Sequence, residues 1–186
     1  MIAPNLLRGE KVRLTAVTSN DLPAITRWWS DPDFLRLYNT APAIPRNEDQ
    51  LSRRFDLSQT SPDVFLFAVR MLDDDDELIG LLEFDGIEWA HRTTFVSIGI
   101  GDARYRGRGY GRDAMQVGLH FVFNELNLYR VCLTVFSYNK AAIALYEALG
   151  FVREGVYREH LERDGQRYDM FLYGLLRPEW MENATE

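Results

Sequence analysis

Apolar residues recur along the chain at two kinds of spacing, and these spacings predict its strands and helices. Short apolar runs rich in β-branched and aromatic residues predict strands over 10–17, 64–71, 78–84, 95–100 and 129–136. Apolar residues three and four positions apart predict helices over 22–29, 47–57, 111–126 and 140–149. The stretch 39–45 holds two prolines and has no period, so we expect it to be a loop.

The end of the chain has the pattern of a long hairpin. Strands are predicted over 152–163 and 166–175, joined by Asp164-Gly165, a dipeptide typical of two-residue hairpin turns. Strands and helices alternate before this hairpin, so the sequence predicts a mixed α/β layer structure. A chain of 186 residues suits one domain spanning 1–186, because that length can bury one sizeable core.

Composition and charge narrow the function only in part. The net charge of −7 disfavours nonspecific binding to a nucleic-acid backbone and favours a cationic small molecule or peptide. No apolar run approaches the roughly 18 residues that span a bilayer, and the N-terminus lacks a secretion signal. The lone Cys132 lies in an apolar run, so we expect a buried, inert thiol in a reducing cytoplasm.

A run of four carboxylates, Asp73-Asp74-Asp75-Asp76, separates two of the predicted strands. Four adjacent carboxylates on a loop repel one another and do not converge on one point. We therefore expect a solvated hairpin turn and no metal site.

Three glycines at alternate positions follow a predicted strand and precede the helix of 111–126. The segment reads Arg104-Tyr105-Arg106-Gly107-Arg108-Gly109-Tyr110-Gly111-Arg112. The first N–H groups of a helix lack partners within the helix and carry the positive end of its dipole, so they bind phosphate. Glycine allows close backbone approach, and the arginines add positive charge. The segment predicts a diphosphate-binding loop, although a plain flexible turn would explain the glycines equally well.

Two other phosphate-binding motifs do not match this segment. A Walker-type loop needs four residues between its glycines and then Lys followed by Ser or Thr. The Rossmann fingerprint needs Gly-x-Gly-x-x-Gly, whereas the spacing here is Gly-x-Gly-x-Gly.

The segment Arg106-Gly107-Arg108-Gly109-Tyr110-Gly111 resembles the acetyl-CoA-binding signature of the GNAT (Gcn5-related N-acetyltransferase) superfamily. The family's next landmark is a strand, an Asn, a short helix with a Tyr, and Gly-Phe; residues 135–151 match it through Asn139, Tyr146 and Gly150-Phe151. Glu154-Gly155 and Asp169 resemble the branch that acetylates ribosomal-protein N-termini (RimJ/RimL-like), and 124–130 with His91-Arg92 resembles spermidine acetyltransferases. The resemblance covers about residues 10 to 180.

The resemblance implies a fold and a co-substrate. The fold is a mixed, mostly antiparallel sheet of about seven strands, splayed between strands 4 and 5 and flanked by about four helices. The co-substrate is acetyl-CoA, without a metal. Main-chain amides would hold its diphosphate, and these belong to Arg106, Gly107, Arg108, Gly109, Tyr110, Gly111 and Arg112. The strand edge at Ile98, Gly99 and Ile100 would pair with the pantetheine arm, and Asn139 would bind the cofactor as well as cap a helix.

The resemblance also implies that Tyr146 is the catalytic acid that protonates the departing thiolate. An unperturbed phenol has a pKa near 10, so it is protonated at neutral pH. The alternative interpretation is a core aromatic residue one helical turn from Leu149 and Ile143.

The amine must lose a proton before it attacks, and many relatives use a Glu for this step. The candidates for the acceptor site are Glu83, within an apolar strand, and Glu88 beside Trp89. A carboxylate is costly to bury unless it is paired or used, but the sequence favours a solvent-facing or structural Glu83. Relatives often carry Glu just before Ile98, where this chain has Val96 and Ser97, so the base stays unassigned. We expect His120 to be a packing residue of its helix and not a catalytic one. We expect His91 to lie in a turn between strands without a catalytic role.

The acceptor amine stays open at this point. Spermidine-acetylating relatives carry an acidic cluster after the first helix, whereas residues 37–46 have no carboxylate and one arginine, Arg46. A polycation would be held poorly there, which leaves a protein N-terminus, a small amino acid or an antibiotic amine. Trp28, Trp29 and Trp89 are candidates for an acceptor pocket, although the spacing of the first two favours a core position.

Three classes of protein are compatible with these features. The first is an N-acetyltransferase that acts in a ternary complex of both substrates. The second is a non-catalytic module that binds acyl-CoA and senses its level, and the third binds a nucleotide phosphate in the same loop. A homodimer through the C-terminal strands is compatible with the sequence but is not determined by it.

Overall fold

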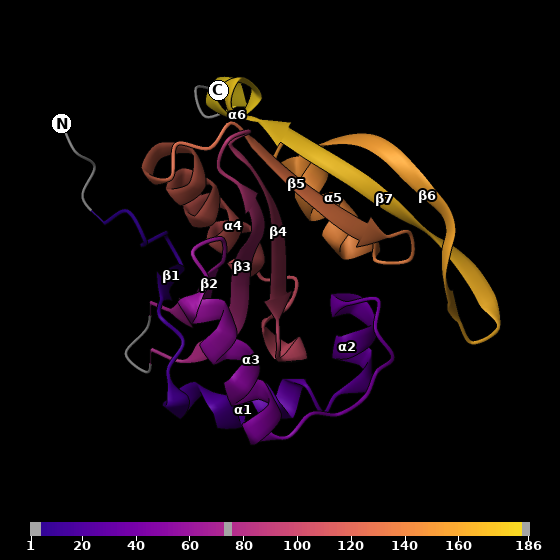
Figure 1. The fold of residues 1–186 in the computed structure, drawn as a ribbon. Coiled ribbons are helices and arrows are strands. Elements are labelled where there is room, and N and C mark those ends of the chain that lie inside the picture. Colours follow the sequence, from indigo (N-terminus) through magenta and orange to yellow (C-terminus); the bar gives the residue numbers. More distant parts are fainter. Residues whose placement is uncertain (1–4, 73–75, 184–186) are drawn as a thin grey trace.

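In the computed structural model, residues 5–72 and 76–183 are described. Within them, seven strands form one sheet in the order β1-β2-β3-β4-β5-β7-β6 (Figure 1). Neighbouring strands are antiparallel except β4 and β5, which are parallel. The strands are β1 Val12–Thr15, β2 Phe65–Met71, β3 Leu78–Glu88, β4 Thr93–Ile100, β5 Arg130–Phe136, β6 Val152–Arg163 and β7 Gln166–Leu176. The predicted mixed, mostly antiparallel sheet is confirmed.

Six α-helices accompany the sheet within the described residues. They are α1 Leu22–Trp28, α2 Pro32–Tyr38, α3 Glu48–Thr60, α4 Tyr110–His120, α5 Lys140–Ala148 and α6 Arg177–Asn183. The expected number of about four was too low, because neither α2 nor α6 was predicted. The helix predicted over 111–126 is also not uniform. After His120 it becomes a π-helical turn over Phe121–Glu125, in which the Leu126 N–H donates to the Phe121 carbonyl, five residues earlier, at 3.1 Å.

The helices cover the two faces of the sheet and enclose two apolar cores. On one face, α4 and α5 bury side chains against the central strands, including Met115, Leu82 and Phe84. On the other face, α1, α2 and α3 bury Ile25, Trp28, Trp29, Phe34 and Phe55. Trp28 and Trp29 are only 7% and 3% exposed, as expected for core residues.

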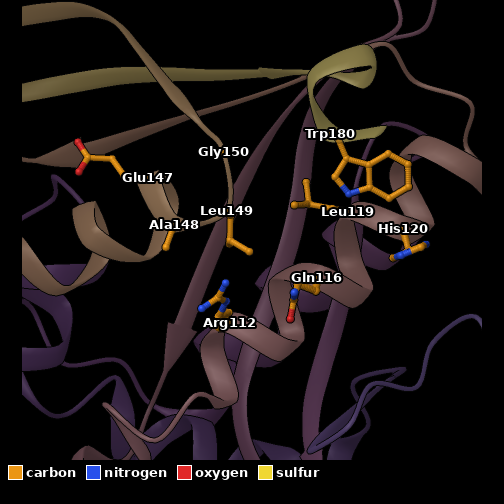
Figure 2. Close-up of a pocket in the computed structure, with 9 residues that line it drawn as sticks. All are labelled: Arg112, Gln116, Leu119, His120, Glu147, Ala148, Leu149, Gly150 and Trp180. Atoms are coloured by element: carbon orange, nitrogen blue, oxygen red, sulfur yellow. The ribbon is translucent and has the colours of Figure 1, made fainter. Parts of the chain in front are cut away.

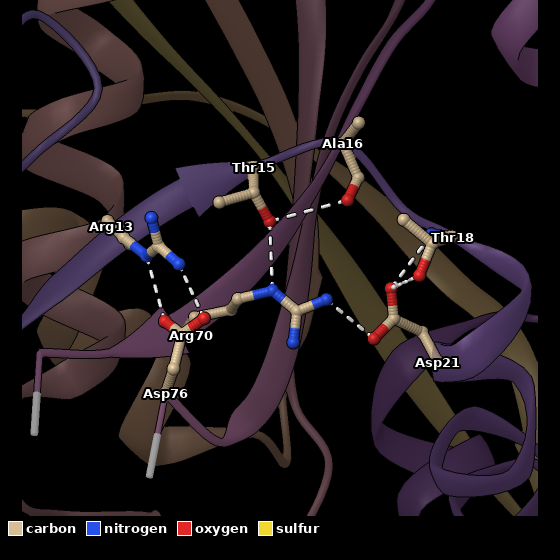
Figure 3. Close-up of polar contacts among 7 residues, drawn as sticks. All are labelled: Arg13, Thr15, Ala16, Thr18, Asp21, Arg70 and Asp76. Atoms are coloured by element: carbon tan, nitrogen blue, oxygen red, sulfur yellow. Dashed lines mark hydrogen bonds and ion pairs between the residues drawn. The ribbon is translucent and has the colours of Figure 1, made fainter. Parts of the chain in front are cut away.

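A polar network ties the first helical turn to the edge of the sheet (Figure 3). The buried Asp21 carboxylate accepts hydrogen bonds from Arg70 at 2.6 Å and from the Thr18 N–H at 2.8 Å. Arg70 also donates to the Thr15 hydroxyl at 3.0 Å. The network satisfies a buried charge and fixes the start of α1 relative to β1 and β2.

The acidic run lies partly outside the described residues, because Asp73, Asp74 and Asp75 are not among them. The described Asp76 pairs with Arg13, whose Nε donates to it at 2.8 Å (Figure 3). In the part of the chain that the structure describes, no three His, Cys, Asp or Glu side chains gather to hold a metal ion. No helix there is both long and apolar enough to cross a membrane.

The sheet opens at its middle, between the two parallel strands. β4 and β5 pair only through Thr93–Phe95 and Arg130–Cys132. Beyond that point β4 continues along β3 to Ile100, while β5 continues along β7 to Phe136. Figure 1 shows β5, β7 and β6 turning away from the other strands. The predicted splay between strands 4 and 5 is therefore confirmed.

Candidate active site

The far half of β4 presents a strand edge to the opening. Ser97 and Gly99 of β4 pair with Glu83 and Leu81 of β3 on one side. On the side facing β5, Ile98, Gly99 and Ile100 have no strand partner within the described residues. An unpaired edge of this kind accepts an extended chain through backbone hydrogen bonds. The structure thus places the three predicted strand residues at an edge without a strand partner, where the Ile100 carbonyl accepts a hydrogen bond from the Arg106 side chain.

The glycine-rich loop lies between this strand and the first turn of α4. Gly107 and Gly109 have φ values of +70° and +87°, a region that residues with a Cβ rarely adopt. Gly109 is the N-cap of α4, and its carbonyl accepts the N–H of Asp113 at 3.0 Å. The N–H groups of Tyr110, Gly111 and Arg112 precede that first helical hydrogen bond, so they have no partner within the helix and can bind an anion.

Two residues that the sequence did not indicate hold this loop in place. The carboxylate of Asp113, in the first turn of α4, accepts backbone N–H groups from Glu10, Lys11 and Val12 at 3.1, 2.8 and 2.9 Å. The Lys11 ammonium donates to the Arg108 carbonyl at 3.0 Å. These partners are about a hundred residues apart in sequence, so no local pattern indicates them.

Both the side chain and the backbone N–H of Arg106 already have hydrogen-bond partners within the protein. Its guanidinium donates to the carbonyls of Ile100 and Gly101 at 2.9 and 2.7 Å, and its own N–H donates to Ala103 at 3.1 Å. It braces the end of β4. The amides open to a diphosphate therefore begin after Arg106, whereas the side chains of Arg108 and Arg112 are exposed.

Helix α5 forms one wall of the opening. Its N-cap is Asn139, whose side chain accepts the Ala142 N–H at 3.2 Å. A Cβ built on Gly111 would lie 3.7 Å from Ile100 and 3.9 Å from Leu145, so the loop, β4 and α5 meet at van der Waals distance. Tyr146, the next residue of α5, is only 6% exposed. Burial raises the pKa of its phenol to about 12.

The opposite wall is α2, the helix that the sequence analysis missed. The Tyr38 ring packs on Gly99 so closely that a Cβ there would lie 2.8 Å from it, and it stacks on Phe34 at 5.2 Å. Burial raises the pKa of the Tyr38 hydroxyl, and the Glu83 carboxylate acts in the same direction. The start of α2 did carry a signal: Asp31 as N-cap, accepting the Asp33 N–H at 2.9 Å, followed by Pro32.

Below Tyr38, two carboxylates project from the same face of β3. Glu83 is 9% exposed and Asp85 is half-buried. Burial raises the pKa of both groups, and the Arg54 guanidinium, 3.8 Å from Glu83, opposes the rise. Glu83 is therefore not solvent-facing. Because two carboxylates lie near one guanidinium, this part of the site has a net negative charge, which favours the binding of an ammonium group.

The other candidates lie apart from this cluster. Glu88 is exposed and pairs with Thr93 at the turn between β3 and β4, about 16 Å along the strand from Glu83 at roughly 3.3 Å per residue. Trp89 is 46% exposed and donates to Asp63 at 2.7 Å. The exposed His91 lies in the same turn. The structure does not bring these residues to Tyr146.

A separate cavity of about 360 Å³ lies between α4, α5 and α6 (Figure 2). Arg112, Gln116 and His120 line it from one side of α4, and Ala148 and Leu149 from the end of α5. The His120 ring is exposed, lies 4.9 Å from the Trp180 ring of α6, and has a polar contact of 3.3 Å with the Asn124 side chain. Tyr146 and Glu83 do not line this cavity.

The features around Gly99 fit a coenzyme A thioester. An open strand edge and free helical N–H groups beside left-handed glycines border the opening, and the helix that carries the protonated Tyr146 phenol contacts the glycine loop through Leu145. Comparison with known proteins agrees. Residues 11–152 match the family described as the acetyltransferase (GNAT) domain. The chain therefore belongs to the GNAT acetyltransferase family.

Individual relatives agree with this family. An uncharacterised N-acetyltransferase of the SPbeta prophage in Bacillus subtilis (strain 168) is 28% identical over 175 residues, covering 94% of this chain and 95% of the relative. The spermidine N(1)-acetyltransferase of Vibrio cholerae is 32% identical over 107 residues, covering 58% and 61%. The structure of the spermidine N-acetyltransferase from Vibrio cholerae, with CoA and spermine, aligns with a TM-score of 0.83 and 26% identity, covering 91% of this chain and 98% of that one.

The class of protein follows from the family, the fold and these relatives. The chain is an N-acetyltransferase that transfers an acetyl group from acetyl-CoA to an amine.

Proposed function

We propose that the amine attacks acetyl-CoA directly, in a ternary complex held between α2 and α5, and that residues 1–186 act as one catalytic domain. The observation that carries this proposal is the packing around the far half of β4. Tyr38 packs on Gly99 from α2, Glu83 pairs with Ser97 from β3, and α5, which carries Tyr146, contacts the glycine loop through Leu145. Both substrates then reach the same point from opposite sides of the sheet.

The open edge and the loop would hold the acetyl donor. Ile98, Gly99 and Ile100 would pair with its pantetheine arm. The N–H groups from Gly107 to Arg112 would hold the diphosphate, and Asn139 would add a side-chain contact beside its role as N-cap. The exposed Arg108 and Arg112 would add favourable charge, while Arg106 keeps β4 in position.

Acetyl-CoA supplies the thioester, and attack of the amine nitrogen on its carbonyl carbon forms the amide bond and breaks the carbon–sulfur bond. A protonated amine loses two protons in this reaction. Glu83 would accept one, directly or through water, because its raised pKa makes it a stronger base than an exposed carboxylate. The phenol of Tyr146 would donate to the departing sulfur, and the second proton of the amine would replace the one it gives up.

The acceptor is proposed to be a primary amine, either a small molecule or a protein N-terminus as in the ribosomal-protein branch. A polyamine is the second candidate, favoured by the names of the spermidine-acetylating relatives and opposed by the absence of carboxylates in 37–46. We also propose that the enzyme works in a reducing cytoplasm, because its one cysteine, Cys132, is buried and unpaired.

Turnover with a panel of amines tests this function. Release of coenzyme A and the mass of the acetylated product are measured with wild-type protein, Glu83→Gln and Glu88→Gln. If Glu83 is the base, Glu83→Gln lowers kcat/KM at least about 100-fold, because a positioned base contributes factors of that size. The matched change at the exposed Glu88 leaves kcat/KM within about twofold. A larger loss in Glu88→Gln than in Glu83→Gln would move the base to the β3–β4 turn.

A further inference from the structure

A pocket of about 400 Å³ adjoins the proposed amine site on its α3 side. Two of the pocket residues also take part in the site. Arg54 lies 3.8 Å from Glu83, and the Trp29 ring is 5.2 Å from that of Tyr38. Leu35, Leu51 and Trp29 give the pocket a buried apolar floor. An acceptor whose amine lies at Glu83 can therefore extend past Arg54 into this pocket.

The charged side chains that line the pocket are both arginines. Arg54 lies on its inner side, next to Glu83, and the exposed Arg46 lies on its rim. Glu48 and Asp49, just beyond Arg46, are not among the lining residues. The side chain of Arg54 already has Glu83 as a partner, and no ion pair joins Arg46 to another described residue. The rim thus offers one cation that is open to a ligand.

Hydrogen-bond acceptors around the pocket are largely occupied by the protein. The Asn39 side-chain oxygen accepts the Ala41 N–H at 2.9 Å, and the Gln50 side-chain oxygen accepts the Asn47 N–H at 3.1 Å. The carbonyls of 39, 40 and 41 accept from the Arg163 guanidinium at 3.1 to 3.3 Å. The groups of the pocket wall that remain free to bind a ligand are mainly hydrogen-bond donors. They are the side-chain amide nitrogens of Asn39 and Gln50 and the guanidinium of Arg46.

We propose that this pocket binds a carboxylate of the acceptor, so that the preferred substrate carries an amine and a free carboxylate, as an amino acid or a short peptide does. The argument rests on the proposed function, because it places the amine at Glu83. Charge balance supports it. Glu83 and Asp85 carry two negative charges and Arg54 carries one positive charge, so the three residues together have a net charge of −1, which matches one ammonium group. Arg46 adds one positive charge, which matches one carboxylate.

Matched acceptors test the proposal. Alanine, dialanine and trialanine are compared with the same three molecules as C-terminal amides. The measured quantity is kcat/KM for each acid divided by kcat/KM for its amide. We expect the best pair to favour the acid by about tenfold, since a guanidinium–carboxylate contact is a strong, charge-assisted one. Arg46→Glu is expected to abolish that preference. The exposed Arg53, on α3 but not in the pocket lining, provides the control Arg53→Glu, which should retain it.

The change in this ratio between variants cancels the different amine pKa values of acids and amides. Calorimetric binding of the same pairs in the presence of coenzyme A gives a second readout that does not need turnover. Equal ratios in wild-type protein and Arg46→Glu would overturn the carboxylate site, while acetylation of both acceptors would leave the proposed function standing. Failure of all these acceptors, with turnover of another amine of the panel, would overturn the carboxylate site alone, and failure of the whole amine panel would overturn both. Preference for a polyamine over all three acids would also overturn the carboxylate site.

Discussion

Burial determines the protonation state of the Tyr146 hydroxyl. The side chain is 6% exposed, its ring lies 5.9 Å from Phe151, and burial alone raises the pKa of the phenol to about 12. A phenol with that pKa is protonated at every pH at which the enzyme can be assayed. A thiol has a pKa near 8.5, so full transfer of the phenol proton to sulfur is uphill by about 3.5 pKa units. Tyr146 would therefore donate a hydrogen bond as the carbon–sulfur bond breaks, and it would transfer its proton to sulfur only as the second amine proton replaces it on the phenol.

Replacement of Tyr146 by Phe should lower kcat at least tenfold without weakening the binding of acetyl-CoA, because the ring still fills its space. The fall should be uniform from pH 6 to pH 9, since the phenol does not titrate there and any slope belongs to the amine and Glu83. Steady-state rates over that range and calorimetric titration with acetyl-CoA measure both quantities. Unchanged turnover would remove Tyr146 from the mechanism.

Residues of the site differ in how far the sequence indicates them. Tyr146 and Asn139 could be named because residues 135–151 resemble a second family landmark, with an Asn, a short helix that holds a Tyr, and Gly-Phe. Glu83 could be named as a candidate but not placed, since an acidic residue in an apolar strand has two faces to choose from. Asp113 and Lys11 left no signal, because their partners lie about a hundred residues away.

At the scale of elements, the start of α4 depends on a left-handed residue. Gly109 has φ of +87°, and a Cβ there would also lie 3.0 Å from the Lys11 ammonium that holds the Arg108 carbonyl. A residue with a Cβ pays about 1–2 kcal/mol in this region of backbone conformation. Relief of that strain would turn the loop and misalign the N–H groups of the first helical turn.

Gly109→Ala should therefore lose stability and weaken acetyl-CoA binding at least about tenfold. The matched control is Gly165→Ala in the β6–β7 turn, where φ is +75° and no atom lies within 4 Å of the added methyl group. Both variants should lose a similar free energy of unfolding, because both carry the same strain. Only Gly109→Ala should lose affinity in a calorimetric titration. Equal affinity in the two variants would show that the loop geometry does not matter for the cofactor.

The elements that the sequence analysis missed share a physical cause. Helices α2 and α6 have seven residues each, so each offers only about two turns of apolar repeat; α1 is equally short and was predicted from Leu22, Ile25, Trp28 and Trp29. The contacts of α2 and α6 are tertiary: Tyr38 of α2 packs on Gly99, and Trp180 of α6 lies 5.0 Å from Phe123. The β6–β7 hairpin, which has a clear period, was predicted within a few residues, and so was α3 from a weaker pattern.

At the scale of the whole molecule, segments that are far apart in the sequence contact each other at α2. The tip of the β6–β7 hairpin reaches α2, where Asp164 pairs with Arg36 at 2.5 Å. Tyr138, just before α5, donates to the Arg36 carbonyl at 2.5 Å across 102 residues of sequence. The C-terminal half of the protein thus fixes the helix that carries Tyr38, and with it one wall of the acceptor site.

Removing the Tyr138 hydroxyl should separate the binding of the two substrates. Tyr138→Phe keeps the ring contacts with Phe136 and Tyr168 but loses the hydrogen bond to α2, at a cost of about 1 kcal/mol in the free energy of unfolding. Because α2 then moves more freely, KM for the amine should rise about threefold or more, while acetyl-CoA, held by α4 and β4, should bind as before. Tyr168→Phe is the control, since its hydroxyl bonds only Gln166 within the same hairpin. A rise in the dissociation constant of acetyl-CoA equal to the rise in amine KM would contradict this division, because it would mean that α2 supports the whole opening and not the acceptor wall alone.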